Sequence, residues 1–383
     1  MRNCSNGHCN IEKDYQELLE ELNSRTSNKS YFDIYFSKVK GKHVHSKLRI
    51  SNDTNFFVEV PLISWPIKYF HKSSDKMVFC ENCLKIRNSN NFDDFLTLNE
   101  LGLNKRICST YCLKKALGKG LDSNDFSSSL NNGWAIYLQG KNGIEVLRRY
   151  QNSIDPEAKI PITAEAISRL IAQIAADIHF FWMELGCSKE NLHTAFKLGC
   201  KSIENFISPP ETLFPEINIK SLTNCIKSVL FNPLKAAFLE EEIPNLFLSE
   251  RTIKQLLGQL TLNSQGINVW DFCSNSFGNE DQACKPDSES CNSFIKGACI
   301  CTIQSCFNHS CDPNCFVYSM GDSTVYISTI RDIKEGEELT ISYIDNTLSL
   351  PERKKLINNY HFECNCNICL TQERLNMQTS KTD

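Results

Sequence analysis

Asn308-His309-Ser310-Cys311 opens the part of this chain that decides how the rest is interpreted. It is followed by Gly336-Glu337-Glu338-Leu339-Thr340-Ile341-Ser342-Tyr343 and then by Cys364-x-Cys366-x2-Cys369. The last stretch supplies three thiolates within six residues, a spacing that is too tight for ordinary core packing and suits three corners of a tetrahedral zinc site. A fourth ligand is missing locally, and three unrelated thiols are the alternative.

A second set of four cysteines lies nearer the N-terminus, as Cys80-x2-Cys83 and Cys108-x3-Cys112. Two such pairs predict one further zinc ion, with two structural cysteine pairs that hold no metal as the alternative. The chain has 20 cysteines in 383 residues. In a reducing compartment, this number indicates metal sites rather than disulfides.

The composition is that of a soluble globular protein, with 41% hydrophobic and 22% charged residues. No apolar run approaches the roughly 20 residues of a membrane span, so we expect no membrane association. The N-terminus has no signal or transit pattern, and we therefore expect the nucleus, the cytoplasm or both. The net charge is −4 and the basic residues are scattered, so we expect no direct binding to nucleic acid.

The hydrophobic pattern predicts strands at both ends of the chain and helices in the middle. Residues 31–67 show short strand-like runs separated by turn residues, and residues 162–262 show apolar residues at helical spacing. Short strands return after Asn263, and a charged helix is expected over 350–358. We therefore expect an α+β protein with small antiparallel β-sheets and a helical insert.

Taken together, the motifs after residue 304 resemble the C-terminal half of a SET-domain protein lysine methyltransferase. Residues 80–112 resemble the first zinc of a MYND finger, which interrupts the SET domain in the SMYD family. The usual second pair of ligands and the closing His and Cys are absent here, so we expect a reduced finger with one zinc. The resemblance covers residues 31–370 and is closest to short members that lack the C-terminal tetratricopeptide-like domain.

The resemblance implies a SET-type fold with a pseudoknot and two small zinc modules. It divides the chain into a flexible N-terminal arm (1–30), the N-terminal part of the SET domain (31–79), the reduced MYND-like finger (80–118), a linker with the helical insert (119–262), the C-terminal SET core (263–349), the post-SET zinc module (350–370) and a tail (371–383). It also supplies the missing ligand, Cys311, for the post-SET zinc. Both zinc ions would be structural.

The resemblance further implies that S-adenosylmethionine is the cofactor. Asn308 and His309 would contact its adenosine part, and a simple turn at these residues is the alternative. Gly41-Lys42-His43 lies where SET enzymes carry a Gly-x-Gly turn that approaches the methionine end of the cofactor. The second Gly is His43 here, and a side chain at this position would narrow the pocket.

Three further residues are assigned by the same resemblance. Asn263 would contact the cofactor, with a helix-capping role as the alternative and Asn275 as a rival. Phe362 would face the adenine and Tyr360 the substrate channel. Aromatic residues just before a zinc knuckle can equally be its hydrophobic support.

Tyr343 is the expected catalytic residue, with a strand tyrosine packed in a core as the alternative. The lysine ε-amine has a pKa near 10.4, so it must lose its proton and be held in line with the methyl–sulfur bond. A desolvated aromatic channel lowers the pKa of the amine. The tyrosine oxygen and nearby carbonyls then orient the methyl group and stabilise the transition state.

We therefore expect a monomeric protein-lysine N-methyltransferase that acts on a histone or another protein. The helical insert is the expected substrate selector. The first alternative is a catalytically weak, zinc-stabilised interaction adaptor, motivated by His43 and the reduced finger. The second is a nucleic-acid-binding zinc protein, which requires a basic face that the composition does not indicate.

Overall fold

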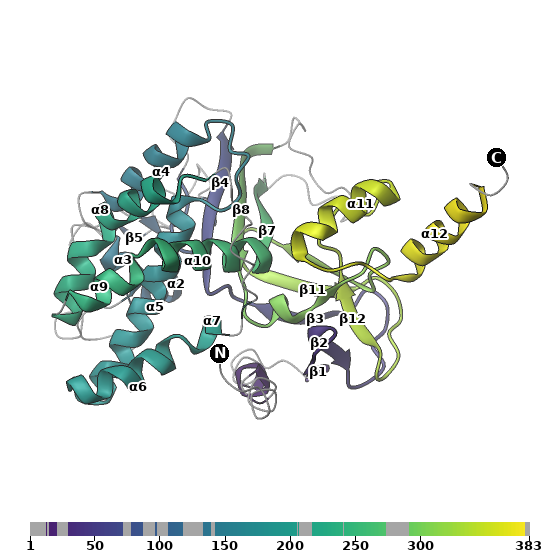
Figure 1. Cartoon of the computed structure of the whole chain (residues 1–383), viewed down its shortest axis with the longest axis horizontal. Coiled ribbons are helices and arrows are strands. Elements are labelled where there is room, and N and C mark those ends of the chain that lie inside the picture. The colour runs from purple at the N-terminus through teal and green to yellow at the C-terminus, as the bar shows by residue number, and fades with distance from the viewer. Residues whose placement is uncertain are drawn as a thin grey trace. The chain divides into compact units, whose positions relative to one another are not determined.

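The computed structural model divides the chain into two compact units (Figure 1). Unit 1 consists of Met1–Val60, Thr302–Tyr318 and Thr324–Asp383, and unit 2 of Pro61–Cys301 and Ser319–Ser323. The structure describes residues 13, 15–20, 30–71, 78–86, 96–97, 106–117, 133–138, 142–204, 206, 217–239, 241–272 and 291–379. Each unit is therefore assembled from segments that lie far apart in the sequence.

Unit 1 contains two small sheets. The first has the order β1 (Phe32–Ser37), β2 (Gly41–Ser46), β12 (Glu338–Ile341) and β9 (Asn308–His309), and the second has the order β10 (Cys315–Ser319), β11 (Val325–Thr329) and β3 (Asn55–Glu59). β12 pairs antiparallel with β2 but parallel with β9, where Thr340 lies opposite Asn308 and Ile341 opposite His309. The first sheet thus joins segments from both ends of the chain, with β12 between β2 and β9.

The burial pattern of β2 explains why this polar stretch forms a central strand. Lys42, Val44 and Ser46 are buried, whereas His43 and His45 between them are only half-buried. This alternation has the period of two that a strand requires. Gly41, at the start of β2, has a φ of +64°, a conformation that favours glycine and allows the turn from β1.

Aromatic side chains fill the core of unit 1. The ring of Phe32 lies 5.2 Å from that of Phe57 and 5.5 Å from that of Phe307, in edge-to-face contacts. Tyr15 and Leu19, one helical turn apart, are also buried in this core. Within residues 1–30, for which we expected a flexible arm, Tyr15 and Leu19 therefore pack into the core, while Lys13, Glu17 and Glu20 of the same helix are exposed.

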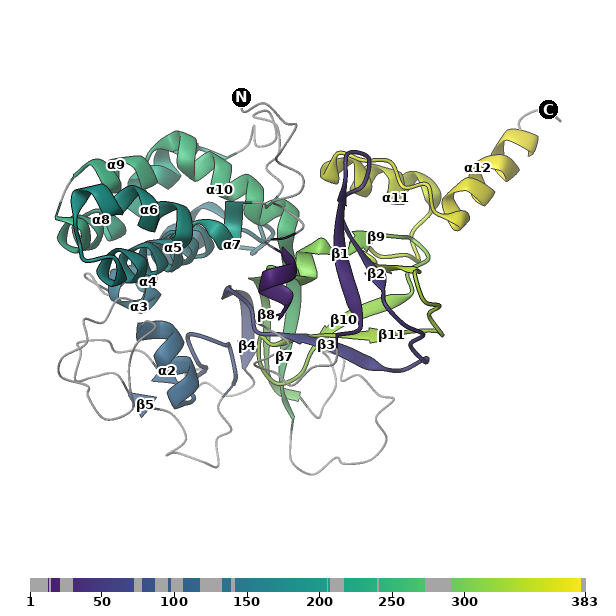
Figure 2. The ribbon, with the colours of Figure 1, turned by 90° about the horizontal axis from the view of Figure 1, so that it is seen from below.

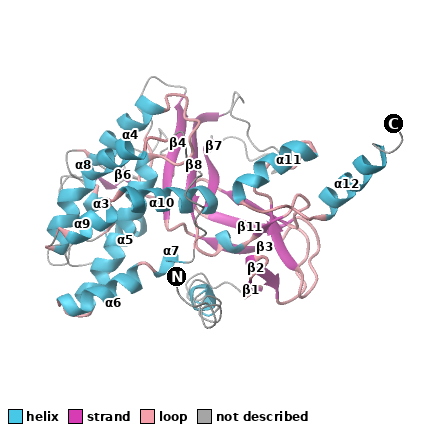
Figure 3. Cartoon of the chain, viewed as in Figure 1, coloured by secondary structure: helices cyan, strands magenta, loops and turns pink. Residues whose placement is uncertain are grey.

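Unit 2 combines a three-stranded antiparallel sheet with a group of helices. The sheet has the order β4 (Ile63–His71), β8 (Cys291–Ile300) and β7 (Ser264–Phe272), and β5 (Leu96–Thr97) pairs with β6 (Arg106–Ile107). The helices are α2 (Thr110–Leu117), α3 (Trp134–Tyr137), α4 (Gly143–Ile154), α5 (Ala164–Glu184), α6 (Lys189–Gly199), α7 (Lys201–Glu204), α8 (Ile219–Phe238), α9 (Glu242–Phe247) and α10 (Glu250–Asn263). Most of them gather on one side of the sheet (Figures 2 and 3).

α5 is the centre of this helical group, and it lies where helical spacing predicted an insert. Its side chains Ile167, Leu170, Ile171, Ile174 and Ile178 are buried. Thr163 caps its N-terminus, because the threonine hydroxyl accepts a hydrogen bond from the backbone N–H of Ala166 at 3.1 Å. The predicted α+β class, with small antiparallel sheets and a helical insert, is confirmed.

The C-terminal part of unit 1 is helical. It contains α11 (Leu350–Ile357), the short helix η3 (Asn358–Tyr360) and α12 (Asn367–Thr379), which extends away from the sheets of its unit (Figures 1 and 2). Ser349 and Glu352 form a capping box at the start of α11, where the charged helix was expected. No helix in the described part of the chain has both the length and the hydropathy to cross a membrane.

Candidate functional site

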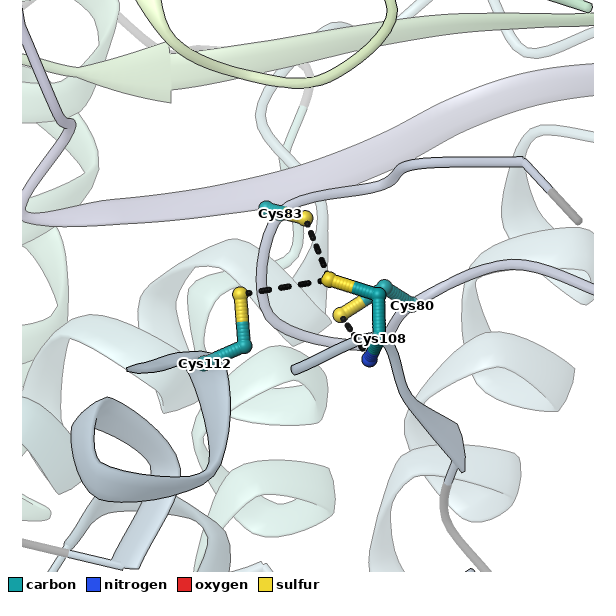
Figure 4. Close-up of side chains that lie close together, drawn as sticks. All are labelled: Cys80, Cys83, Cys108 and Cys112. Carbon is teal, nitrogen blue, oxygen red and sulfur yellow. Dashed lines mark hydrogen bonds between the residues drawn. The ribbon is translucent and has the colours of Figure 1, made fainter. Parts of the chain in front are cut away.

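The first cysteine cluster lies in unit 2 and is formed by Cys80, Cys83, Cys108 and Cys112 (Figure 4). Their sulfur atoms all lie within 4.8 Å of one another. The Cys80–Cys83 turn is closed by a hydrogen bond of 2.8 Å from the backbone N–H of Leu84 to the carbonyl of Cys80. α2 carries Cys112, one helical turn after Cys108. The structure therefore brings together the four residues that the spacing predicted.

The sulfur–sulfur distances fit a bound zinc ion. Tetrahedral coordination with Zn–S bonds of about 2.3 Å places neighbouring sulfurs about 3.8 Å apart, whereas a disulfide needs about 2.05 Å. Cys108 Sγ lies 3.5 Å from Cys83 Sγ and 3.6 Å from Cys112 Sγ. The backbone N–H of Cys108 also donates to Cys80 Sγ at 3.4 Å, which suits a thiolate acceptor. This donor set matches structural zinc.

Paired charges surround the first cluster. Glu81, between the first two cysteines, accepts from Arg148 at 2.9 Å and from Arg169 at 3.0 Å. Both arginines also contact Glu165, at 2.7 Å each. Arg169 and Glu165 are buried, and the Arg169 guanidinium lies 4.5 Å from the centre of the Trp134 ring. The turn that carries Cys80 and Cys83 is thus tied to α4 and α5.

The second cluster lies in unit 1 and joins Cys311 to Cys364, Cys366 and Cys369. Cys311 Sγ lies 3.9 Å from Cys364 Sγ and 3.6 Å from Cys369 Sγ, again close to the spacing of a tetrahedral zinc site. The pairing with Cys311 is the one that the family resemblance implied. The four ligands come from two segments that α11 and the strands separate.

Arg353 is a residue at this second cluster that the sequence did not reveal. It is buried in α11, and its guanidinium contacts Cys369 Sγ at 3.8 Å, the Leu348 carbonyl at 2.6 Å and the Gln372 side chain at 2.8 Å. Its positive charge lies beside the second cluster, in which four thiolates and one Zn²⁺ would together carry a net charge of −2. The only local sign of this role is its place on the buried face of a charged helix.

Tyr343 lies two residues after the end of β12, within a cluster of aromatic rings. Its hydroxyl donates to the Phe307 carbonyl at 2.7 Å. Its ring lies 5.0 Å from that of Tyr360 and 6.4 Å from that of Phe362. Burial raises the pKa of the Tyr343 hydroxyl, with a smaller contribution from Tyr360. The hydroxyl therefore stays protonated at neutral pH and acts as a donor to Phe307.

His309 is in contact with Tyr343 on one side and with the second cysteine cluster on the other. Its Nδ1 accepts from the backbone N–H of Tyr343 at 3.0 Å, and its Nε2 lies 3.3 Å from Cys311 Sγ. Burial, with Arg353 nearby, lowers the pKa of His309 to about 4. We define the aromatic cluster as Tyr343, Tyr360, Phe362 and His309.

Two buried polar side chains hold the segments around Asn308. The Glu59 carboxylate accepts three backbone N–H bonds, from residues 302–304, at 2.8 to 3.1 Å. Asn314 donates to the Glu338 carbonyl at 2.8 Å and accepts from the Thr340 N–H at 2.8 Å. The sequence did not reveal either role, because the partners lie 24 to 245 residues away in the chain.

The expected cofactor residues of unit 1 lie close together. The Asn308 amide donates to the Lys40 carbonyl at 3.4 Å and to the Glu338 carboxylate at 3.2 Å, so Asn308 borders the turn before β2. A Cβ built at Gly41 would meet no atom within 4 Å, which leaves one side of this turn open. The residues present therefore fit a ligand that approaches the backbone here.

His43 and Lys42 point to opposite faces of β2. The His43 ring turns back to the Gly41 carbonyl, 3.1 Å from its Nδ1, and lies among the rings of Tyr35 and His45. Lys42 is buried, and its Nζ donates to the Tyr15 hydroxyl at 3.2 Å. Burial lowers the pKa of Lys42. The His43 ring therefore occupies the face opposite to the buried one.

Asn263 belongs to unit 2. It is the last residue of α10, and its side-chain amide donates to the Gln259 carbonyl at 2.7 Å. This bond is a contact with the end of its own helix, as in the helix-end alternative. The rival residue, Asn275, lies outside the described residues.

A comparison with protein families finds that the SET-domain model matches residues 13–344. A SET domain-containing protein of Acanthamoeba polyphaga mimivirus is 31% identical over 163 residues, which are 41% of this chain and 64% of that protein. A SET and MYND domain-containing protein of Dictyostelium discoideum is 44% identical over 69 residues (18% of this chain, 20% of that protein). The histone-lysine N-methyltransferase SMYD3 of Homo sapiens is 46% identical over 71 residues (18% and 16%). The chain spans less than two thirds of the length of each of these relatives.

Proposed function

The chain belongs to the SET-domain family, and from this premise we propose that it is a protein-lysine N-methyltransferase that uses S-adenosylmethionine. One observation carries the proposal. The Tyr343 hydroxyl is fixed by the Phe307 carbonyl inside a cluster of aromatic rings, next to the parallel pairing of β9 with β12. A buried, oriented hydroxyl walled by rings suits the transfer of a methyl group to an amine.

S-adenosylmethionine, when bound, supplies an electrophilic methyl group on a positively charged sulfur. Asn308, His309 and the turn at Gly41 would hold it, together with Lys42, His43, Asn263 and Phe362 as the family resemblance implies. The open side of the Gly41 turn and its closeness to the Asn308 amide support this assignment. Aromatic faces nearby favour a cation such as the sulfonium.

The aromatic cluster would prepare the amine. A lysine amine between Tyr343 and Tyr360 loses contact with water, and desolvation lowers its pKa, so that the neutral, nucleophilic form becomes accessible. The Tyr343 hydroxyl donates its proton to the Phe307 carbonyl in a hydrogen bond, so the lone pairs of its oxygen remain available to accept a hydrogen bond from the amine. The ring walls exclude the water that would otherwise compete for the amine.

Both cysteine clusters would hold zinc in a structural role. Each offers four thiolates and no open position, which is the donor set of closed structural sites rather than catalytic ones. Such sites need a reducing compartment, so we place the protein in the nucleus or the cytoplasm.

The substrate would be a lysine side chain on a protein. Relatives from Homo sapiens and Arabidopsis thaliana are named as histone-lysine N-methyltransferases. We extend to this chain the substrate class, a protein lysine on a histone or another protein, and we expect it to act as a monomer. The helical insert of unit 2 would select the substrate.

The test combines binding with transfer. Isothermal titration of zinc-loaded protein with S-adenosylmethionine and S-adenosylhomocysteine should show micromolar binding of both. With labelled cofactor and histones or a cell extract as acceptor, Tyr343→Phe should lower methyl transfer by at least about 100-fold. The matched control is Tyr318→Phe, the same chemical change at a tyrosine stacked between Phe316 and Tyr326, which should retain transfer.

A folded, zinc-loaded protein that binds neither cofactor would contradict the enzyme proposal. The adaptor alternative would then account for the two cysteine clusters. If the protein binds the cofactor and Tyr343→Phe transfers methyl groups as fast as the wild type, only the catalytic role of Tyr343 is wrong and the enzyme proposal stands.

A further inference from the structure

The His309 side chain hydrogen-bonds both to the backbone of Tyr343 and to Cys311 of the second cluster. Its Nδ1 faces the backbone N–H of Tyr343 at 3.0 Å. Its Nε2 faces Cys311 Sγ at 3.3 Å. The imidazole therefore spans the distance between the candidate catalytic residue and a candidate zinc ligand.

The partners of His309 determine where its proton lies. A backbone N–H can only donate, so Nδ1 must be bare and accept from Tyr343. An imidazole with a bare Nδ1 is neutral and carries its single proton on Nε2. That proton points to the sulfur of Cys311, within the 4.0 Å that a hydrogen bond to sulfur allows.

Zinc completes this assignment. A cysteine that binds zinc is a thiolate, which has no proton and can only accept. The Nε2–H of His309 is the donor that such a sulfur requires. Bound zinc would also hold the Cys311 sulfur at one position relative to Nε2. The hydrogen bond is therefore strongest when the second cluster holds its metal.

We propose that His309 is a positioning residue that couples zinc occupancy of the second cluster to the placement of Tyr343. The bound metal fixes the tautomer and the ring plane of His309 through Cys311, and the bare Nδ1 then holds the backbone N–H of Tyr343. This inference rests on the proposed function, because the consequence of a fixed Tyr343 is a fixed hydroxyl beside the Phe307 carbonyl.

A space-filling role for His309 is the competing explanation. Its ring contacts those of Tyr343 at 5.3 Å and Phe362 at 6.1 Å, and packing alone would also steady Tyr343. The two explanations differ in whether the two ring nitrogens matter. Coupling requires an acceptor on one side of the ring and a donor on the other, whereas packing requires only volume.

Two substitutions separate the halves of the imidazole. His309→Asn places an amide oxygen near the Nδ1 position, so the Tyr343 N–H keeps an acceptor while the donor to Cys311 is lost. His309→Gln places an amide NH₂ near the Nε2 position, so the donor to Cys311 is kept while the acceptor at Nδ1 is lost. Loss of a side chain that hydrogen-bonds to a metal ligand usually weakens metal binding by about 10–100-fold.

The expected results are opposite for the two variants. In the full chain, His309→Asn should release zinc from the second cluster about 10–100-fold faster and leave hydrogen exchange of the Tyr343 amide unchanged. His309→Gln should release zinc at the wild-type rate and raise amide exchange at Tyr343 by about 10-fold. Equal effects of both variants on both readouts would overturn the proposal.

Removal of the metal tests the coupling itself. Cys369→Ser, washed with a chelator, should raise exchange at Tyr343 more than at Thr340 of β12, whose N–H donates to the Asn314 side chain and not to His309. In the double variant with His309→Asn, the excess at Tyr343 should disappear. An equal rise at both amides in Cys369→Ser means local unfolding and contradicts the coupling.

A measurement on the wild type covers the case in which the variants do not fold. With ¹¹³Cd in the second cluster, the His309 Nε2 proton should show scalar coupling to the metal across the hydrogen bond to Cys311. If no such scalar coupling is seen and the His309 proton is found on Nδ1, the proposal is overturned. None of these readouts uses methyl transfer. A protein that shows the coupling between zinc occupancy and Tyr343 but transfers no methyl group would therefore contradict only the proposed function.

Discussion

The two cysteine clusters have the same donor set but different surroundings. In unit 2, Cys80, Cys83 and Cys112 belong to a large apolar core, and paired arginines and glutamates surround the turn between the first two. In unit 1, the second cluster shares a small apolar group with Leu350. Its neighbours include the Arg353 guanidinium and the His309 imidazole, which also contacts Tyr343. The same chemistry thus supports a core in one unit and borders a candidate active site in the other.

The first prediction removes one ligand from each cluster and has the largest expected effect on stability. Structural zinc contributes about 10–16 kcal/mol of apparent binding free energy in finger peptides, and much of this is folding free energy. We expect Cys112→Ser to lower the melting temperature by at least about 10–20 °C. We expect Cys369→Ser to lower it by only about 2–4 °C but to abolish methyl transfer.

Zinc content, thermal melting and methyl transfer check this pair. Each variant should lose one zinc ion per chain relative to the wild type. If Cys112→Ser melts like the wild type, or if Cys369→Ser keeps full transfer, the contrast between the two clusters is wrong.

The second prediction concerns the paired charges beside the first cluster. Arg169→Met leaves the buried Glu165 with Arg148 as its remaining partner and removes the contact to the Trp134 ring. Breaking a buried pair on one side costs about 3–5 kcal/mol. Denaturant unfolding of unit 2 should report this loss. The control is Arg149→Met on the exposed side of α4, for which we expect a change below about 0.5 kcal/mol.

The third prediction concerns Arg353, whose guanidinium contacts the second cluster. Arg353→Met removes the charge next to Cys369 and the bond to Gln372. We expect a loss of about 1–3 kcal/mol and a zinc release about 10-fold faster, with partial recovery in Arg353→Lys. A competing chelator measures the release rate. Lys355→Met on the exposed face of α11 should behave like the wild type.

The smallest predicted effect is a pH dependence in unit 1. Because burial lowers the pKa of Lys42, the folded state binds fewer protons than the unfolded state between this lowered pKa and the unfolded value near 10.4. Stability from this group therefore rises with pH. The melting temperature of the wild type, relative to Lys42→Met, should increase by a few degrees at most from pH 7 to about 9.5. A difference that falls with pH would contradict a desolvated ammonium.

Local patterns predicted the parts of the site whose residues are close in the chain. Cys364, Cys366 and Cys369 are recognisable by spacing alone, and so are the two pairs of the first cluster. The choice of Tyr343 followed from a family motif, whereas its hydrogen bond to the Phe307 carbonyl was not predicted. The α+β class followed from hydrophobic periodicity.

Sequence reasoning missed features that depend on distant partners. Glu59 and Asn314 look like ordinary surface residues until folding brings backbone N–H groups to them. Gly41-Lys42-His43 was placed in a turn by the family resemblance, whereas these residues begin strand β2, in which the polar Lys42 and Ser46 face the interior. Tyr15 and Leu19 carried a helical spacing, but nothing local showed that a core would receive them.

The discontinuous make-up of unit 1 sets the order in which the protein can be completed. His45 of β2 bonds to the Gly336 carbonyl, 291 residues later in the chain. During synthesis, residues 61–301 leave the ribosome before β12 is made, so unit 2 can fold while β2 still lacks its pairing with β12. Contacts of such high sequence separation form slowly. The candidate active site is therefore the last part to assemble, and a nascent chain would be inert until translation has passed Cys369.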